Sequence, residues 1–137
     1  MKKFVFGTLL FLFAFASVQA QSRGTYDNGQ KKYEGTVSKG KKVGEWVFFH
    51  DNGQKQREGV YSNGIPSGDW KEYYRNGQMK SEGRYVSSGG KAEKHGTWTT
   101  YHKKGSRKTE GDYRAGKPVG TWFEYNTLGI EIKKIQR

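Results

Sequence analysis

Short segments of alternating aromatic and polar residues, each interrupted by a turn signal, run through most of the chain. The segment Gly44–Tyr61 is representative, with alternation on both sides of Asn52-Gly53. Side chains alternate between the two faces of a β-strand, and Asn-Gly is the strongest short-range signal for a two-residue type I′ turn. The segment is therefore predicted to form a β-hairpin in which Trp46 lies opposite Gly59.

This turn fixes the remaining pairs of the hairpin. It predicts that Asp51 faces Gln54, Phe48 faces Arg57 and Gly44 faces Tyr61. A large ring thus lies opposite a residue without a side chain at both Trp46 and Tyr61. A ring that covers the bare backbone of a neighbouring strand offsets the cost of placing glycine in a strand.

The hairpin pattern recurs every 24 residues, with one step of 28 residues in each series. Three kinds of position mark the period: a turn glycine, a Glu-Gly pair and a Gly-x-Trp triplet. The members are Gly29, Gly53, Gly77, Gly105 and Gly129; Glu34-Gly35, Glu58-Gly59, Glu82-Gly83 and Glu110-Gly111; and the triplets ending at Trp46, Trp70, Trp98 and Trp122. Repeats of this length are typical of arrays in which each unit buries its face on the next.

The same register in the later hairpins pairs Trp70 with Gly83 and Trp98 with Gly111. The rings are expected to form a ladder on one face, which is the main source of burial. Tyr73, Tyr101 and Tyr125 come three residues after a Trp and fall on the opposite, more polar face. On that face the register pairs Lys71 with Glu82, Tyr73 with Lys80 and Tyr101 with Lys108.

The two ends of the array depart from the pattern. Gly35 has only Ser22 available as a partner, and Trp122 faces Ile135 where the other units have glycine. We therefore predict an all-β fold, an elongated antiparallel meander of hairpins with units near 26–49, 50–73, 74–101 and 102–125 and a C-terminal cap at 126–137.

A secretory signal is predicted at the N-terminus. Lys2-Lys3 precede an apolar run from Phe4 to Ala16, and small or apolar residues precede Gln21. This order is typical of a cleaved signal peptide, with an uncleaved anchor as the alternative, and the run is shorter than the roughly 20 residues that span a bilayer. Residues 1–20 are expected to form a signal helix, with 21–137 secreted or periplasmic. No Cys follows the predicted cleavage site, so we do not expect a lipoprotein.

The unit Trp70–Tyr85, with Asn76-Gly77-Gln78 and Glu82-Gly83, resembles the bacterial variant of the MORN repeat. The resemblance extends over about four units and implies a meandering antiparallel sheet. It also implies several roles: association with membranes or phospholipids, protein scaffolding and, for cytoplasmic bacterial members, neutralisation of a toxin as an antitoxin. The predicted signal peptide departs from that last group.

Most residues that could carry chemistry recur at the repeat period, which indicates a structural role. Glu34, Glu58, Glu82 and Glu110 are interpreted as partners in cross-strand polar pairs. His50 and His102 occupy equivalent positions beside turns, and no metal-ligand spacing is present. The chain has no Cys, which excludes thiol chemistry and thiolate metal sites. We expect no catalytic, cofactor or metal site, and a hydrolase acting on glycans is the weakest alternative.

The third unit contains four extra residues between Tyr85 and Gly96. The inserted stretch, Val86–His95, is interpreted as a tolerated surface loop, with a recognition loop as the alternative.

The chain carries a formal net charge of +12, which points to an anionic partner. Cations follow each turn glycine by two to five residues and are expected to form a stripe along one edge of the sheet. The candidate residues for an anionic partner are Lys55, Arg57, Lys80, Arg107, Lys108 and Lys133; Lys39, Lys41, Lys42, Lys91, Lys94, Arg114 and Lys117 fall on the opposite loops. Solubility and the blunting of strand edges are the alternative explanation.

These observations favour an exported, non-catalytic repeat scaffold that binds anionic lipid, glycolipid or a protein partner. Nucleic acid fits the charge but neither the export signal nor any recognition motif. The alternative is an antitoxin-like or immunity-like module that neutralises a toxin protein.

Overall fold

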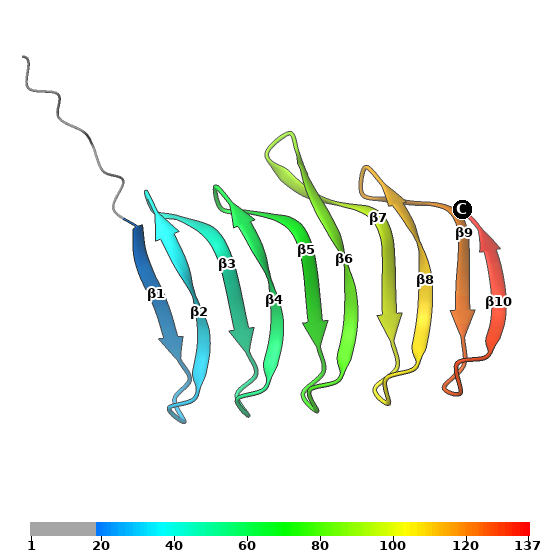
Figure 1. The fold of residues 1–137 in the computed structure, drawn as a ribbon, viewed down its shortest axis with the longest axis horizontal. Coiled ribbons are helices and arrows are strands. Elements are labelled where there is room, and N and C mark those ends of the chain that lie inside the picture. Colours follow the sequence, from blue (N-terminus) through cyan, green and yellow to red (C-terminus); the bar gives the residue numbers. More distant parts are fainter. Residues whose placement is uncertain (1–18) are drawn as a thin grey trace, which may run out of the picture.

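A single ten-stranded antiparallel sheet makes up the part of the chain that the computed structural model describes, residues 19–137 (Figure 1). The strands follow one another in sequence order, so the fold is a pure meander, as predicted. They are β1 (Gln19–Thr25), β2 (Lys31–Ser38), β3 (Lys41–Phe49), β4 (Lys55–Ser62), β5 (Ile65–Tyr73), β6 (Met79–Ser88), β7 (Lys91–Tyr101), β8 (Arg107–Arg114), β9 (Lys117–Tyr125) and β10 (Glu131–Gln136).

The predicted signal helix lies outside the described residues, except for its last two positions. Gln19 and Ala20 belong to β1, where they pair with Ser38 and Val37. Cleavage before Gln21 would remove these two residues and leave the rest of the strand paired with β2.

The predicted cross-strand register of the central hairpins is confirmed. Trp46 lies opposite Gly59, and Trp70 and Trp98 lie opposite the corresponding glycines of β6 and β8. The atypical pairs at the two ends, Ser22 with Gly35 and Trp122 with Ile135, are also confirmed.

The predicted type I′ turn at Asn52-Gly53 is wrong. Gly53 has a φ of 83°, but Asn52 is not among the non-glycine residues with positive φ, whereas a type I′ turn needs positive φ at both positions. Gly53 donates its N–H to the carbonyl of His50, and His50 donates to the carbonyl of Gln54. Asp51, Asn52 and Gly53 therefore form a three-residue loop, and Gln54 pairs with His50 and not with Asp51.

A bulge beside the loop restores the predicted register. Phe49 pairs with Lys55 but Phe48 pairs with Arg57, so Gln56 is left without a partner across the strand pair. The longer loop and the bulge each shift the pairing by one residue, in opposite directions. The same bulge recurs at Lys80 and Lys108, and it makes two predicted pairs wrong: Tyr73 faces Met79 and Tyr101 faces Arg107.

Two-residue turns occur at the other edge of the sheet. Lys39-Gly40, Asn63-Gly64, Gly89-Gly90 and Ala115-Gly116 each have positive φ at both positions. These turns close tightly, since the flanking residues pair directly in every case, as Ser38 does with Lys41.

The inserted stretch in the third unit lengthens this kind of hairpin. Val86 pairs with Glu93 and Ser87 with Ala92, so the extra residues extend β6 and β7 by two positions each and do not form a loop. Figure 1 shows the longer hairpin projecting beyond its neighbours. An addition of two residues to each strand leaves every other side chain on its original face.

A bend near the start of each tryptophan-bearing strand comes from glycine. Gly35 pairs with Trp46 but Thr36 pairs with Val43, which leaves Gly44 and its successor unpaired with β2. Gly44 has a φ of 66°, a conformation that residues other than glycine rarely adopt. Figure 1 shows β3, β5, β7 and β9 turning sharply at these positions.

Each indole ring covers a glycine of the preceding strand, and not the glycine across its own hairpin. The ring of Trp70 lies over Gly59 of β4, and the rings of Trp46, Trp98 and Trp122 lie likewise over Gly35, Gly83 and Gly111. The expectation that Trp46 covers Gly59 is therefore wrong, although the two residues pair. Each glycine is bare because the next unit's ring occupies the space of a side chain.

The indole N–H groups strengthen this contact. The Nε1 atoms of Trp46, Trp70 and Trp98 donate to the carbonyl oxygens that follow the covered glycines, at distances of 3.1, 3.2 and 3.2 Å. A buried polar group needs such a partner, which favours tryptophan over phenylalanine at these positions. The three rings are only 2–5% exposed.

Tyrosines join the indoles into one continuous aromatic core. From Trp46 to Trp122 the tryptophans alternate with Tyr61, Tyr85 and Tyr113, with centroid distances of 5.0–6.3 Å. The interplanar angles of 72–88° are those of edge-to-face contacts, the preferred geometry of aromatic pairs. The predicted ladder of rings is thus present on one face of the sheet.

Alanine at Gly83 should destabilise the protein, because its Cβ atom would overlap the ring of Trp98. Overpacking of a rigid core costs about 1–3 kcal/mol. Without the ring, Gly→Ala in a strand would instead stabilise by about 0.5–1 kcal/mol. Denaturant unfolding of Gly83→Ala is expected to show a loss of about 2 kcal/mol, and equal or greater stability would contradict the assignment. Arg84→Ala, at the exposed neighbouring position, is the control and should change stability by less than about 0.5 kcal/mol.

Candidate functional site

The sheet presents two faces and two edges to a partner. The indole face carries Trp46, Trp70, Trp98 and Trp122, and the carboxylate face carries Glu34, Glu58, Glu82 and Glu110. The loop edge holds the five loops that contain the repeat glycines Gly29, Gly53, Gly77, Gly105 and Gly129, and the tip edge holds the four two-residue turns. Figure 1 shows these edges at opposite ends of the strands.

The repeated glutamates are held in polar clusters that recur along the carboxylate face. Glu58 accepts a hydrogen bond of 2.5 Å from the hydroxyl of Tyr73 and forms an ion pair of 2.6 Å with Lys55. Glu82 accepts a 2.6 Å hydrogen bond from Tyr101, and Glu34 and Glu110 pair with Lys31 and Arg107. The tyrosine hydrogen bonds to Glu58 and Glu82 join neighbouring strands, β4 with β5 and β6 with β7, which agrees with the structural role inferred from the repeat.

Ionisation on this face is tuned by the same contacts. Burial would raise the pKa of Glu58, but hydrogen bonds from Lys55 and Tyr73 outweigh it and lower the pKa. Burial, together with the hydrogen bond to Glu58, raises the pKa of Tyr73 to about 12. Burial and the hydrogen bond to Glu82 likewise raise the pKa of Tyr101 to about 12.

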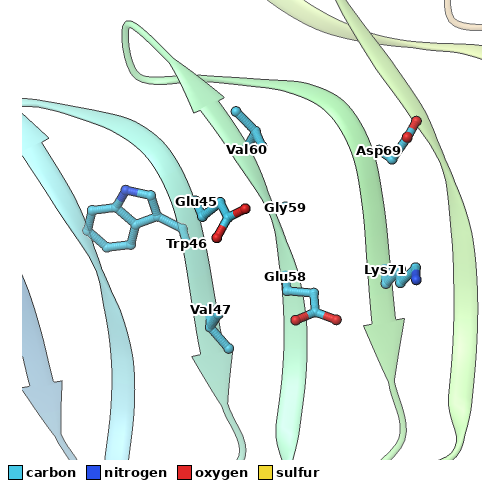
Figure 2. Close-up of a pocket in the computed structure, with 8 residues that line it drawn as sticks. All are labelled: Glu45, Trp46, Val47, Glu58, Gly59, Val60, Asp69 and Lys71. Atoms are coloured by element: carbon cyan, nitrogen blue, oxygen red, sulfur yellow. The ribbon is translucent and has the colours of Figure 1, made fainter.

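A shallow depression on the carboxylate face collects several charged groups (Figure 2). Glu45, Glu58, Asp69 and Lys71 line it, together with the aliphatic side chains of neighbouring strands. Glu58 is bound by Lys55 and Tyr73, and Asp69 lies 3.4 Å from Arg84. These two carboxylates are therefore paired with protein cations.

The two repeated histidines hold successive loops together. The Nε2 atom of His50 lies 3.0 Å from the carbonyl oxygen of Tyr73, and that of His102 lies 2.9 Å from the carbonyl of Tyr125. In the alternate units Tyr26 and Tyr74 make the equivalent bond through their hydroxyl groups. Across residues 19–137 no group of three or more His, Asp or Glu side chains is arranged to hold a metal ion.

Two lysines fill aromatic cages on the indole face. The Lys42 ammonium lies 4.6–5.1 Å from the ring centroids of Trp46, Phe48 and Tyr61. The Lys94 ammonium lies 4.1 Å from Trp98 and 4.9 Å from Tyr113. Burial lowers the pKa of both lysines, and the rings offset this by cation–π attraction. These two cations are occupied within the core and are not free for an anionic partner.

The six cations predicted to form one stripe are divided among different environments. Lys55 and Arg107 are ion-paired on the carboxylate face, and Lys80 lies 3.6 Å from Glu72. Arg57 stacks on the ring of Phe48 at 4.3 Å. Lys108 is a bulge residue, and Lys133 lies opposite Glu124 in the last strand pair.

The tip edge carries a second set of cations. Lys39, Lys41, Lys91, Arg114 and Lys117 flank or occupy its turns and are exposed, and none is within ion-pair distance of a carboxylate in residues 19–137. The sequence pattern placed these residues on the opposite loops but favoured the other edge. The sequence did not reveal that repeated glutamates near the loop edge pair with Lys31, Lys55 and Arg107. Lys103, Lys104 and Lys108 of that edge make no ion pair within residues 19–137.

No helix that could cross a membrane is found in the described part of the chain.

Comparison with known protein families gives one match. The family model of the MORN repeat variant matches residues 42–63, 66–87 and 94–115. Each matched segment begins in a tryptophan-bearing strand and ends at or near the tip of the following strand, and each contains one loop and one indole. No curated protein matches the chain.

Replacing Tyr73 with Phe should show the strength of the Tyr73–Glu58 hydrogen bond. A hydrogen bond to a charged group contributes about 1.5–3 kcal/mol when buried, so about 1 kcal/mol is expected at this half-buried position. The raised pKa of Tyr73 means that its contribution is complete below the unfolded pKa near 10 and is lost as pH rises towards about 12. Urea unfolding should therefore show that Tyr73→Phe is less stable than the parent protein at pH 8, and that the two proteins are equally stable at pH 12. A difference that persists at pH 12 would contradict the assignment, and Tyr125→Phe serves as the control, because no hydrogen bond of its hydroxyl is present in residues 19–137.

Proposed function

We propose that this chain, a repeat protein built from MORN-variant units, is an exported, non-catalytic scaffold that binds an anionic surface through its tip edge. The carrying observation is the row of exposed, unpaired cations at that edge. Anionic lipid headgroups or acidic glycolipids of a cell envelope are the partners that agree with the predicted export signal.

The non-catalytic part of the proposal is supported by the division between repeated and unrepeated residues. Glu58, Glu82, His50 and His102 occupy repeated positions and have structural partners in the described chain. A catalytic constellation is assembled once and includes groups with no structural partner. The pattern here is that of a binding surface.

The geometry of the tip edge supports contact with an extended, flat partner. Neighbouring strands lie about 4.8 Å apart, so successive hairpin tips of this sheet are about 10 Å apart. Lys39 and Lys41 lie at the first tip of the row, and Arg114 and Lys117 lie at the fourth. Lys91 stands on the extended hairpin, which projects further than its neighbours (Figure 1). Each lysine or arginine near an anionic leaflet contributes about 1 kcal/mol to binding.

A toxin-neutralising or immunity-like module remains the second candidate. It is supported by the outer edges of β1 and β10, which pair with no other strand within residues 19–137 and can pair with a strand of another protein. Specific, salt-resistant binding to one small protein in place of anionic lipid would favour this candidate.

Replacement of tip-edge lysines should strongly reduce binding to anionic vesicles. The quadruple variant Lys39→Gln, Lys41→Gln, Lys91→Gln and Lys117→Gln is expected to lose most of the sedimentation of the chain with phosphatidylglycerol-containing vesicles. Unmodified protein should bind and should be released as salt rises from 0.1 to 1 M, where the screening length falls from about 10 to 3 Å.

A matched set at the loop edge provides the control. Lys80, Lys103, Lys104 and Lys108 are also exposed, and their replacement by Gln removes the same charge. This control should retain most vesicle binding. If the control set loses binding and the tip set does not, the stripe along the loop edge is the contact surface; if neither protein nor variant binds, the electrostatic proposal fails.

A further inference from the structure

Each of the first three loops reaches forward to the next loop through two polar side chains, whereas the fourth loop has Lys104 and Ser106 at these positions, and Ser106 donates to the carbonyl of Thr127. Asn28, Asn52 and Asn76 donate from Nδ2 to the carbonyl oxygens of Asp51, Arg75 and Lys103, at 2.8, 2.8 and 3.0 Å. Gln30, Gln54 and Gln78 place their Oε1 atoms against the glycines of the same following loops. These Asn and Gln side chains therefore contact the repeat unit that follows their own.

The last loop carries apolar residues at both positions. Leu128 takes the place of the Asn and is 81% exposed, and Ile130 takes the place of the Gln and is 58% exposed. Ile132, at the bulge position, is 62% exposed. These three lie within five residues of one another in the sequence and account for three of the four large exposed hydrophobic residues in the described part of the chain.

A further MORN-type unit cannot follow β10. Its tryptophan would have to cover the residue opposite Trp122, where the earlier strands have glycine. Ile135 fills this position with a branched side chain. The outer edge of β10 is therefore closed to the repeat but open to a different kind of strand.

The outer edge of β10 offers backbone hydrogen bonds. The N–H of Arg137 points towards β9, where it donates to the carbonyl of Gly120. Successive N–H groups of a strand alternate in direction, so those of Gln136 and Lys134 point away from the sheet. An edge with free N–H and C=O groups is a template for another strand.

Charge selects among the strands that could bind. Lys133, Lys134 and Arg137 are exposed and make no ion pair within residues 19–137, while Glu131 is the one carboxylate of β10. A second copy of β10, paired antiparallel through its outward N–H groups, would place Lys134 opposite Lys134 or, in the next register, Lys133 opposite Arg137. Like charges directly opposite are destabilising, which disfavours self-pairing.

We propose that the outer edge of β10 binds an extended acidic segment of another protein. The segment runs antiparallel to β10, with acidic residues beside Lys133, Lys134 and Arg137, followed by apolar residues beside Ile130 and Leu128. Backbone pairing provides the affinity, and the order of acidic and apolar residues provides the specificity. This site lies on the last strand and does not depend on vesicle binding at the tip edge.

The test is selection of random ten-residue peptides, displayed on phage, against the purified full chain. Peptides with two or more acidic residues followed by apolar residues should be enriched. A synthetic peptide of the selected sequence should bind about tenfold more weakly to Gln136→Pro, which removes an outward N–H from an edge position where proline is tolerated. The double variant Leu128→Asn, Ile130→Gln restores the residues of the earlier loops, so it should fold, and it should also weaken binding about tenfold.

The tip-edge variant Lys39→Gln, Lys41→Gln is the matched control and should bind the peptide as the parent protein does. Circular dichroism of each variant establishes that the sheet is intact. The proposal is overturned if no acidic–apolar pattern is enriched, or if the selected peptide binds both edge variants as tightly as the parent. It is also overturned if sedimentation equilibrium shows a dimer that Gln136→Pro dissociates, since β10 would then be occupied by a second copy.

Discussion

The structure depends on one contact, an indole ring lying on the bare backbone of a glycine in the preceding strand. The chain has few aliphatic residues, so nearly all burial must come from aromatic rings, and a ring can lie flat on a strand only where a side chain is missing. The N–H groups of Trp46, Trp70 and Trp98 each bond to the carbonyl that follows the covered glycine, as Trp70 does with Val60. One residue type thus supplies both the apolar area and the hydrogen bond that joins consecutive units.

This contact gives the sheet a direction. Every unit provides a ring to the unit before it and a glycine to the unit after it, and its loop donates hydrogen bonds forward. The ends of such an array cannot be equivalent. Ser22 occupies the position that tryptophan holds in the later units, and Ile135 occupies the position that glycine holds in the earlier units. The repeated residues are therefore committed to holding the units together. Residues that differ from unit to unit, at the hairpin tips and on β10, are not committed in this way, and for this reason we propose them as binding surfaces.

The sequence was sufficient for the strand order and for most of the register, and it was misleading about local geometry. Asn52-Gly53 indicated the wrong turn, yet the register was right because the bulge at Gln56 cancels the extra loop residue. The choice between two glycines could not be made from sequence, since Trp46 lies opposite Gly35 on one side and Gly59 on the other.

The candidate site shows the same limit. The basic excess was visible in the sequence, but which cations are neutralised was not. The pair Lys55–Glu58 spans a bulge that the pattern did not reveal, so a charge that looked free is bound to a carboxylate. Lys42 and Lys94 were interpreted as loop cations, whereas their ammonium groups enter aromatic cages that exist only once the strands are paired. Charge that depends on tertiary packing cannot be counted along a chain.

The most direct test of the central contact is the ring-current shift of the glycine Hα protons, measured by NMR. Protons under an indole ring should resonate well upfield of ordinary glycines at Gly35, Gly59, Gly83 and Gly111. In the variant Trp46→Leu the upfield shift should disappear at Gly35 and persist at Gly59. Loss of the shift at Gly59, or glycine Hα resonances at ordinary positions in the parent protein, would contradict the account.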